Sequence, residues 1–336
     1  MVIEPDGSVA CVEGRPVETT VHDRALGVIL ASACGDALGA GYEFGPPLPA
    51  DEPITMRGGG NAEWAPGEWT DDTSMMIPIL ESIASGHPLD DPSTLGRIVA
   101  EWADWAQDGA TIGRQTAAVF GRLTANTEDA ARAAAAAVHA ERGRSGGNGS
   151  LMRTAPIALA FLGDGQKRPL ADAARRISEL THVDEDAGDA CTLWSAAIRS
   201  TVRRGSLELR AGIPLLAKDR RTIWLDRIEE AEQSQPEDFT DRNRWVVGAI
   251  QGAIAAVVRG SDLVDVIERA VRGGNDTDTV ATIAGALGGA VHGASALPER
   301  WTLLVHGWPG KRLEWLQTLT ERALERVPEI RRNERA

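Results

Sequence analysis

Residues 275–294 read NDTDTVATIAGALGGAVHGA, a stretch in which an acidic motif runs directly into a series of small residues. Gly285, Gly289 and Gly293 recur at every fourth position, which places them on one face of a helix. Glycine inside a helix costs roughly 1 kcal/mol relative to alanine, so this spacing is typical of a helix that a second backbone approaches closely. We therefore predict a tightly packed central helix over residues 277–294.

Small residues recur at every fourth position in two more stretches of the chain. Their members are Gly27, Ala31, Gly35 and Gly39 in the first, and Gly248, Gly252 and Ala256 in the second. The three stripes together predict three central helices that cross one another at short distances. Coincidence in a sequence that holds 36 glycines is the alternative interpretation.

Helical patterns fill most of the remaining sequence, whereas the alternation of apolar and polar residues that marks strands is scarce. We predict an all-α fold in one domain over residues 23–330, with Asp23 as the first N-cap, after a loose extension over residues 1–22. The predicted helices cover residues 23–40, 71–85, 92–107, 113–123, 128–142, 170–180, 186–203, 206–217, 224–233, 244–259, 263–272, 277–294 and 310–327.

The composition limits the classes of function. The 336 residues include 35 basic and 49 acidic side chains, and the net charge of −14 argues against non-specific binding to nucleic acids or anionic membranes. Three cysteines without CxxC spacing predict neither a disulfide framework nor a zinc site. The polar start of the chain is no signal peptide, so we expect a cytoplasmic protein. Residues 279–297 lack charged side chains but are only weakly apolar, and a buried helix is expected there rather than a membrane span.

Two short acidic motifs lie about 200 residues apart: Trp69-Thr70-Asp71-Asp72-Thr73 and Asn275-Asp276-Thr277-Asp278-Thr279. Helix capping explains one carboxylate in each motif, but not two carboxylates together with hydroxyls. Hard divalent cations prefer oxygen ligands of these kinds, so the motifs predict a metal site. Because Asp276 and Asp278 face the same way only in an extended chain, we expect the helix to begin at or just after Thr279.

Further short motifs follow in a fixed order. They are Gly35-Asp36-Ala37-Leu38-Gly39 with Glu43, the two acidic motifs, Gly147-Asn148-Gly149-Ser150-Leu151-Met152-Arg153, Thr181-His182 and His306-Gly307-Trp308-Pro309. Together they resemble the ADP-ribosylglycohydrolase family over about residues 23–315. Several motifs in order are far more specific than any one of them.

The resemblance implies an orthogonal bundle of helices with a dinuclear metal cleft that holds two Mg²⁺ or Mn²⁺ ions. It implies hydrolysis of the bond that links ADP-ribose to a modified arginine or serine side chain, in an ADP-ribosylated protein or a small ADP-ribose conjugate. We expect the protein to be a monomer. By motif matching, the metal ligands are Thr70, Asp71, Asp72, Asp276, Asp278 and Thr279, the catalytic residues are Glu43, Asp71 and Asp72, and the ADP-ribose channel contains Asn148, Gly149, Ser150, Met152 and His182.

Ribosyl transfer chemistry agrees with these roles. Cleavage of a ribosyl bond passes through an oxocarbenium-like state and usually requires nearby carboxylates. Metal ions orient ribose hydroxyls and lower the pKa of a bound water. Our hypothesis is that Glu43 handles the proton transfers.

Other interpretations stay open at this stage. Asn148-Gly149 is also a strong turn signal, and Asp36 inside an apolar helix fits a hydrogen-bonded buried carboxylate. Several arginine-type family members carry an Asp where Thr111 stands, which weakens the case for arginine as the acceptor. A non-catalytic ADP-ribose-binding or structural protein, and a hydrolase of nucleic-acid-linked or free ADP-ribose, are the alternatives. A terpene-type synthase is disfavoured, because Met75 stands where its motif requires an acidic residue.

Overall fold

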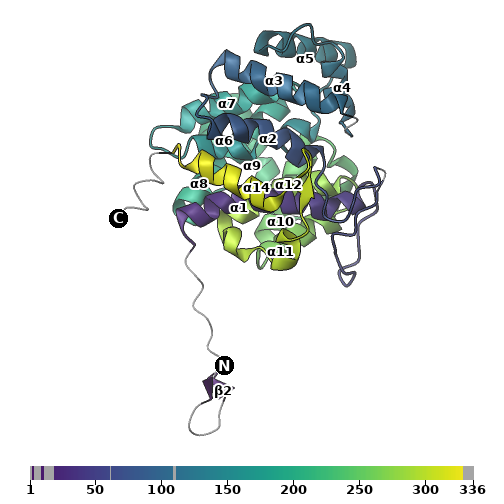
Figure 1. Cartoon of the computed structure of the whole chain (residues 1–336), viewed down its shortest axis with the longest axis vertical. Coiled ribbons are helices and arrows are strands. Elements are labelled where there is room, and N and C mark those ends of the chain that lie inside the picture. The colour runs from purple at the N-terminus through teal and green to yellow at the C-terminus, as the bar shows by residue number, and fades with distance from the viewer. Residues whose placement is uncertain (1, 4–8, 11–18, 61, 109–110, 328–336) are drawn as a thin grey trace.

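The computed structural model describes residues 2–3, 9–10, 19–60, 62–108 and 111–327, and helices dominate it (Figure 1). The all-α prediction is confirmed. The α-helices are α1 (Val21–Gly39), α2 (Asp71–Ala84), α3 (Pro92–Gln107), α4 (Arg114–Phe120), α5 (Glu128–Arg142), α6 (Ala155–Ala160), α7 (Lys167–Glu179), α8 (Glu185–Arg204), α9 (Lys218–Gln233), α10 (Val246–Arg259), α11 (Leu263–Arg272), α12 (Thr277–His292), α13 (Glu299–Thr302) and α14 (Leu313–Leu324). Shorter 3-10 helices are η1 (Ala40–Tyr42), η2 (Asn148–Ser150), η3 (Ile213–Leu215), η4 (Pro236–Arg242) and η5 (Ala294–Ala296).

Strands are confined to two short antiparallel pairs in the described residues. One pair joins β1 (Val2–Ile3) to β2 (Val9–Ala10), and the other joins β3 (His306–Gly307) to β4 (Lys311–Arg312). Most of residues 1–18 and all of residues 328–336 lie outside the described part, so the predicted extension and the end of the predicted domain are not tested there.

Most predicted helices occur within a few residues of their expected ends, and capping explains the best matches. The side chains of Asp91, Thr127 and Asp262 each accept a hydrogen bond from a backbone N–H in the first turn of α3, α5 and α11. The start of α1 differs from the prediction, because Thr20 rather than Asp23 is the N-cap. Asp23 lies inside the first turn and accepts hydrogen bonds from the backbone and hydroxyl of Ser295.

The predicted helix over residues 206–217 is wrong. In this segment the structure has turns and the short η3. Gly205 ends α8 in the left-handed conformation, with φ of 71°. Pro214 has no N–H to give to a helix, and its ring hinders the turn before it, which disfavours a helix through the segment. The structure also has α6, α13 and η4, which the sequence patterns did not predict.

The small-residue stripes of α1 and α12 face each other in an antiparallel crossing. A methyl group built on Gly35 would lie 2.3 Å from the carbonyl oxygen of Ala281, and one on Gly285 would lie 2.3 Å from that of Ala31. One on Gly289 would lie 2.1 Å from the carbonyl oxygen of Gly27. No Cβ atom fits at these distances, so glycine is what allows the two backbones to approach.

The third stripe has a different role from the one we predicted. In α10, a methyl group on Gly248 would meet the carbonyl oxygen of Arg242 at 2.2 Å, which belongs to the adjacent η4. Gly252 leaves ordinary contact distance to Val280 of α12. Thus, of the three predicted helices, α1 and α12 cross with their backbones in contact. In α10, Gly248 instead allows the helix to pack against η4, the segment that precedes it in the chain.

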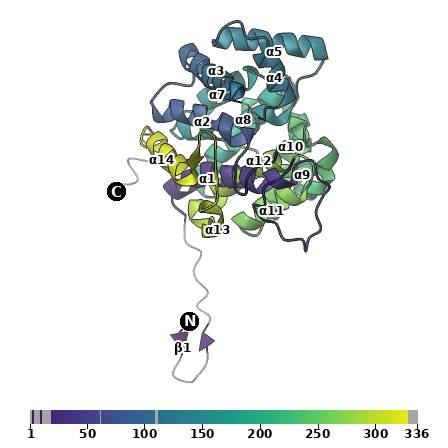
Figure 2. The same cartoon turned by 45° about the vertical axis from the view of Figure 1, so that its right-hand side comes forward.

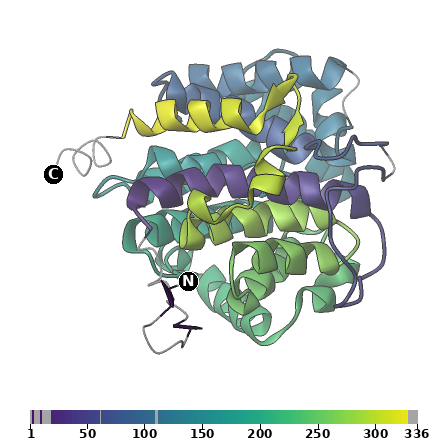
Figure 3. The same cartoon turned by 60° about the horizontal axis from the view of Figure 1, so that its bottom comes forward.

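The arrangement of helices places α1 and α12 centrally. In Figures 1 and 2, α3, α4 and α5 lie at one end of the molecule and α11 lies at the other, with α1 and α12 between them. Figure 3 shows α1 (purple) running through the middle with α14 (yellow) on one side. One continuous apolar core surrounds these helices, and a small separate cluster joins α4 to α5.

One described segment has the length and composition of a membrane-spanning helix. It is α1 with η1, over Val21–Tyr42, with a mean hydropathy of 1.4. The whole of this apolar window is buried inside the fold, as in the core helix of a globular protein. Residues 279–297 include most of α12, which is almost wholly buried, as predicted.

The central crossing leads to a prediction about stability. Gly35→Ala is expected to lower the free energy of unfolding by about 3 kcal/mol, because the new methyl group forces α1 away from Ala281. Urea unfolding measures the change. Gly113→Ala is the matched control, since a methyl group there meets nothing within 4 Å. Equal stability of the two variants would contradict the close crossing.

Candidate metal centre and active site

The crossing of α1 and α12 brings the end of one helix beside the start of the other. The hydroxyl of Thr277 donates to the carbonyl oxygen of Gly39, at 2.9 Å. Just beyond α1, Phe44 N–H donates to the carbonyl oxygen of Asn275 at 2.5 Å, and Asn275 N–H donates to that of Gly45 at 2.7 Å. Glu43 is thereby fixed next to the second acidic motif, although 233 residues separate it from Asp276.

The first acidic motif reaches the same place through Asp36 of α1. Its carboxylate accepts hydrogen bonds from Thr70 N–H at 3.0 Å, from Thr73 N–H at 2.9 Å and from the Thr73 hydroxyl at 2.6 Å. Asp36 thus satisfies the free N–H groups at the start of α2 and ties this helix to α1. The interpretation of Asp36 as a hydrogen-bonded buried carboxylate is confirmed.

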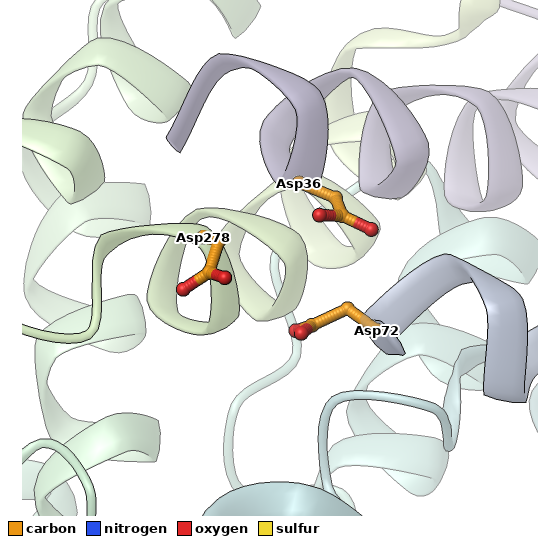
Figure 4. A group of neighbouring side chains, drawn as sticks. All are labelled: Asp36, Asp72 and Asp278. Carbon is orange, nitrogen blue, oxygen red and sulfur yellow. The ribbon is translucent and has the colours of Figure 1, made fainter. Parts of the chain in front are cut away.

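Two groups of three carboxylates result from this packing. Oxygen atoms of Asp36, Asp72 and Asp278 lie within 4.8 Å of one another, as do those of Glu43, Asp276 and Asp278. Figure 4 shows the first group, with one side chain each from α1, α2 and α12 pointing toward a common centre. Asp278 belongs to both groups, so the two centres share a carboxylate. This arrangement has the donor set of a dinuclear site for hard cations.

The remaining predicted ligands surround these groups. The hydroxyls of Thr70 and Thr279 lie 3.2 and 3.4 Å from the same oxygen of Asp72. Asp71 is half-buried in the first turn of α2 and belongs to neither group. Glu43 is also half-buried, whereas Asp72, Asp276 and Asp278 are nearly inaccessible to solvent. Solvent therefore reaches the centre on the side of Glu43 and Asp71.

The start of α12 agrees with the predicted range of residues 277–294, but it contradicts the later start at Thr279 that the spacing of Asp276 and Asp278 suggested. The helix begins at Thr277, so Asp278 lies in its first turn and Asp276 immediately precedes it. Asn275 has a φ of 57°, and this left-handed turn bends the chain so that both carboxylates face the same centre. A sharp bend, rather than an extended segment, brings them together.

Burial and mutual repulsion dominate the electrostatics. Burial and the charges of Asp276 and Asp71 raise the pKa of Glu43 to about 8. Burial and the charges of Asp36 and Asp276 raise the pKa of Asp71 to about 7. The pKa values of Asp72 and Asp278 are raised well above the ordinary range, with burial as the main cause. Such a cluster is stable in ionised form only when positive charge compensates it.

The donor set fits divalent cations by a further observation. Asp72 Oδ1 is buried and has no hydrogen-bond partner, although its other oxygen has two hydroxyl neighbours. A buried carboxylate oxygen without a partner is costly, and a bound cation would remove that cost.

Two surface cavities of about 300 and 340 Å³, beside α14 and beside the start of α1, are lined by none of the predicted site residues.

The raised pKa values predict how the metal-free protein responds to pH. Glu43 and Asp71 have ordinary values of 4.5 and 3.8, so between about pH 4 and pH 8 the folded protein binds more protons than the unfolded chain. The free energy of unfolding therefore falls as the pH rises through this window. In EDTA, we expect the melting temperature to be lower at pH 8 than at pH 5.5, by at least about 2 °C. Saturating Mg²⁺ should reduce this difference, and equal melting temperatures in EDTA would contradict the cluster.

Asn148 connects the second group of predicted residues to the carboxylates. Its Nδ2 donates to Asp276 Oδ2 at 2.8 Å and to the carbonyl oxygen of Asn243 at 2.9 Å. The side chain of Asn243 accepts from Asn275 Nδ2 and from Asp276 N–H, and it donates to the carbonyl oxygen of Gly274. Asn243 is almost fully buried at the junction of three loops. The sequence analysis missed it, because the polar stretch around it has the composition of a solvated loop.

The other residues of the predicted channel divide into two sets. Gly149 lies against the ring of His182, and both adjoin Asn148. Ser150 and Met152 face the core instead: the Cys191 thiol donates to the Ser150 hydroxyl at 3.5 Å, and Met152 belongs to the apolar cluster. Their predicted contact with ADP-ribose remains a prediction.

An all-α fold in which two helix N-termini carry buried carboxylates beside a half-buried glutamate has the features of a metal-assisted hydrolase. The family model for ADP-ribosylglycohydrolase matches residues 17–333. The chain therefore belongs to the ADP-ribosylglycohydrolase family, and it is a hydrolase. Membership of this family indicates that the reaction is the hydrolysis of an ADP-ribose linkage.

Known proteins of the family resemble the chain over most of its length. It is 28% identical to the ADP-ribosylarginine hydrolase Tri1 of Pseudomonas putida, with 92% of this chain and 80% of that protein covered. It is 28% identical to the ADP-ribosyl-[dinitrogen reductase] glycohydrolase of Rhodospirillum rubrum, with 84% and 90% covered. A solved structure described as an ADP-ribosylglycohydrolase-related protein complex superposes with a TM-score of 0.70 at 28% identity, over 91% of this chain and 98% of that one.

Proposed function

We propose that the protein releases ADP-ribose from a modified protein side chain, with two divalent cations, Mg²⁺ or Mn²⁺, bound between the two acidic motifs. The observation that carries this proposal is the pair of carboxylate groups that share Asp278, together with the unpartnered oxygen of Asp72. Capping alone would require neither feature. The relatives named as hydrolases of ADP-ribosylated arginine and dinitrogen reductase support the same class of substrate.

The cations would be held by the predicted ligands Thr70, Asp71, Asp72, Asp276, Asp278 and Thr279. When bound, they would orient the ribose hydroxyls and lower the pKa of a water molecule. Asp36 would act indirectly, because its oxygens already accept three hydrogen bonds from α2. It would hold the first motif against α1 and add negative charge to the centre.

Glu43 would handle the proton transfers. Its carboxylate is half-buried, lies near Asp276 and Asp278, and is fixed by the backbone bonds that follow it. The bond between C1 of the distal ribose and the acceptor atom breaks, and the oxygen of water bonds to C1. Glu43 takes a proton from the water and returns one proton to the departing side-chain atom, so that the carboxylate ends the reaction as it began.

Arginine and serine both stand as acceptors in this proposal. Thr111 is exposed and supplies no carboxylate for a guanidinium. In the acidic stretch at residues 184–186, which begins α8, Asp186 already pairs with Arg227 at 2.7 Å. These features favour a neutral acceptor such as serine, whereas the name of the Tri1 relative favours arginine. Only substrate comparison separates them.

The test is the release of ADP-ribose from arginine-, serine- and DNA-linked substrates in Mg²⁺, Mn²⁺ or EDTA, with Asp276→Ala as the inactive control. We expect metal-dependent release from a protein-linked substrate and none from the variant. Binding of ADP-ribose without release would favour a non-catalytic binding protein. Release from the DNA-linked or another ADP-ribose derivative alone would favour that alternative substrate. If the protein neither binds ADP-ribose nor releases it from any substrate, the proposal is overturned.

A further inference from the structure

The ring of His182 packs against the turn at residues 147–149. A methyl group built on Gly147 would lie 3.3 Å from His182 Nε2, and one on Gly149 would lie 3.2 Å from Cε1. The ring therefore occupies the space that side chains at these positions would need. Its Nε2 edge lies against Gly147 and Gly149, and Asn148 between these two glycines donates to Asp276.

The other ring nitrogen of His182 has a defined partner. The Thr181 hydroxyl lies 2.7 Å from His182 Nδ1 and 2.6 Å from Arg153 Nη2. A guanidinium can only donate hydrogen bonds, so the Thr181 oxygen accepts from Arg153. That oxygen could also accept from His182, but the described residues offer the Thr181 hydroxyl hydrogen no acceptor other than His182 Nδ1. We therefore assign His182 Nδ1 as the acceptor. In the neutral ring this assignment leaves the proton on Nε2.

Arg153 is itself held in place without a carboxylate partner in the part of the chain that the structure describes. It is fully buried, its guanidinium stacks 4.0 Å from the ring centre of Trp102, and Nη2 also lies 3.4 Å from the carbonyl oxygen of Ile177. Burial lowers the pKa of Arg153 to about 9, so it is still charged at neutral pH. Burial and the charge of Arg153 hold the pKa of His182 well below its usual range.

We propose that Arg153 and Thr181 are positioning residues that fix His182 as a neutral ring with its Nε2–H directed at the turn of residues 147–149, where it donates to an oxygen of the bound ADP-ribose unit. The identity of the ligand rests on the proposed function, but the tautomer does not. A neutral donor of this kind orients the substrate without exchanging protons, and Glu43 is left as the group that does. Because Gly147 and Gly149 have no side chains, the His182 ring and the ligand oxygen both fit beside the turn.

The tautomer can be measured directly by ¹⁵N NMR of the full chain labelled at histidine, with His182→Gln used to assign the signal. At pH 7 in the absence of ligand, we expect the Nε2–H tautomer. Thr181→Ser should keep it, because the hydroxyl remains. Thr181→Val should give a mixture of tautomers, because the donor to Nδ1 is lost. A protonated ring or the Nδ1–H tautomer in the unmodified protein would overturn the proposal.

The second part of the proposal is that His182 Nε2–H donates to ADP-ribose, and calorimetric measurement of ADP-ribose binding tests it. Thr181→Val should raise Kd about fivefold to tenfold, the usual effect of losing one well-placed hydrogen bond, and Thr181→Ser should restore it. Thr320→Val is the matched control, since Thr320 is a buried threonine of α14 that bonds only to the Leu316 carbonyl oxygen. An altered tautomer with unchanged Kd would overturn the donor role. If Thr181→Val does not fold, the tautomer measured in the unmodified protein still decides whether the assignment is right.

These outcomes are distinct from failure of the proposed function. The NMR measurement needs neither substrate nor turnover, so an inactive protein with the Nε2–H tautomer would leave the positioning of His182 intact. Active enzyme with the other tautomer would overturn this inference alone.

Discussion

Glu43→Gln is expected to lower kcat by about 10³-fold, the middle of the range for loss of a general acid or base. The amide keeps the size of the side chain but cannot accept a proton from water. Because the backbone bonds around Phe44 and Gly45 fix this segment, the geometry of the site should persist. Calorimetry should then show that ADP-ribose binding is nearly unchanged and that Mg²⁺ still binds, because Asp276 and Asp278 of the second carboxylate group remain. Steady-state kinetics with the preferred substrate measures the loss.

Glu101→Gln is the matched control for this variant. Glu101 is a half-buried glutamate whose pKa is also raised, to about 7, by burial and by Glu81. It lies on α3, outside the carboxylate groups, so its substitution should leave kcat unchanged. An equal loss in both variants would point to a general effect on folding. Wild-type turnover in Glu43→Gln would remove Glu43 from the proton transfers.

Asp278→Asn is expected to abolish both metal binding and turnover, because Asp278 is the carboxylate common to both groups. Its effect on stability should have the opposite sign in the two states of the protein. In EDTA the variant should melt at a higher temperature than the wild type, since one buried negative charge is removed from a repelling cluster. In Mg²⁺ the wild type should gain stability by mass action and the variant should not.

Thermal melting in EDTA and in Mg²⁺ distinguishes this prediction from a simple loss of structure. Asp265→Asn is the control, because Asp265 lies on α11 and pairs with Arg269 at 2.9 Å at the surface. That substitution should lower stability slightly in both conditions and should leave the response to Mg²⁺ intact. A variant of Asp278 that melts lower than the wild type in EDTA would show that the charge is compensated without metal.

The sequence predicted much of the fold because helices depend on local signals. Capping side chains, prolines and helical periodicity fixed most helix ends, and they failed where Pro214 interrupts an apparently helical stretch. The every-fourth spacing of small residues also predicted the central crossing. The spacing did not show whether a stripe packs against another long helix or against the segment that precedes it in the chain, as Gly248 does.

The candidate site was predicted in outline, since the two acidic motifs are visible in the sequence and the structure brings them together. Sequence spacing did not show that Asp71 would lie outside both carboxylate groups, or that Asp278 would be shared by them. It gave no signal for Asn243, because a buried amide and a solvated one have the same local composition.

By itself, the sequence determined most of the helical segments, the two closely packed faces of α1 and α12, and the two motifs that supply most of the clustered carboxylates. Only the tertiary structure decided which carboxylates share a centre and which groups contact the two nitrogens of His182. The physical reason is that these properties depend on contacts between side chains far apart in the chain. The contacts form only once glycines allow α1 and α12 to cross at backbone distance and Asp36 binds the start of α2.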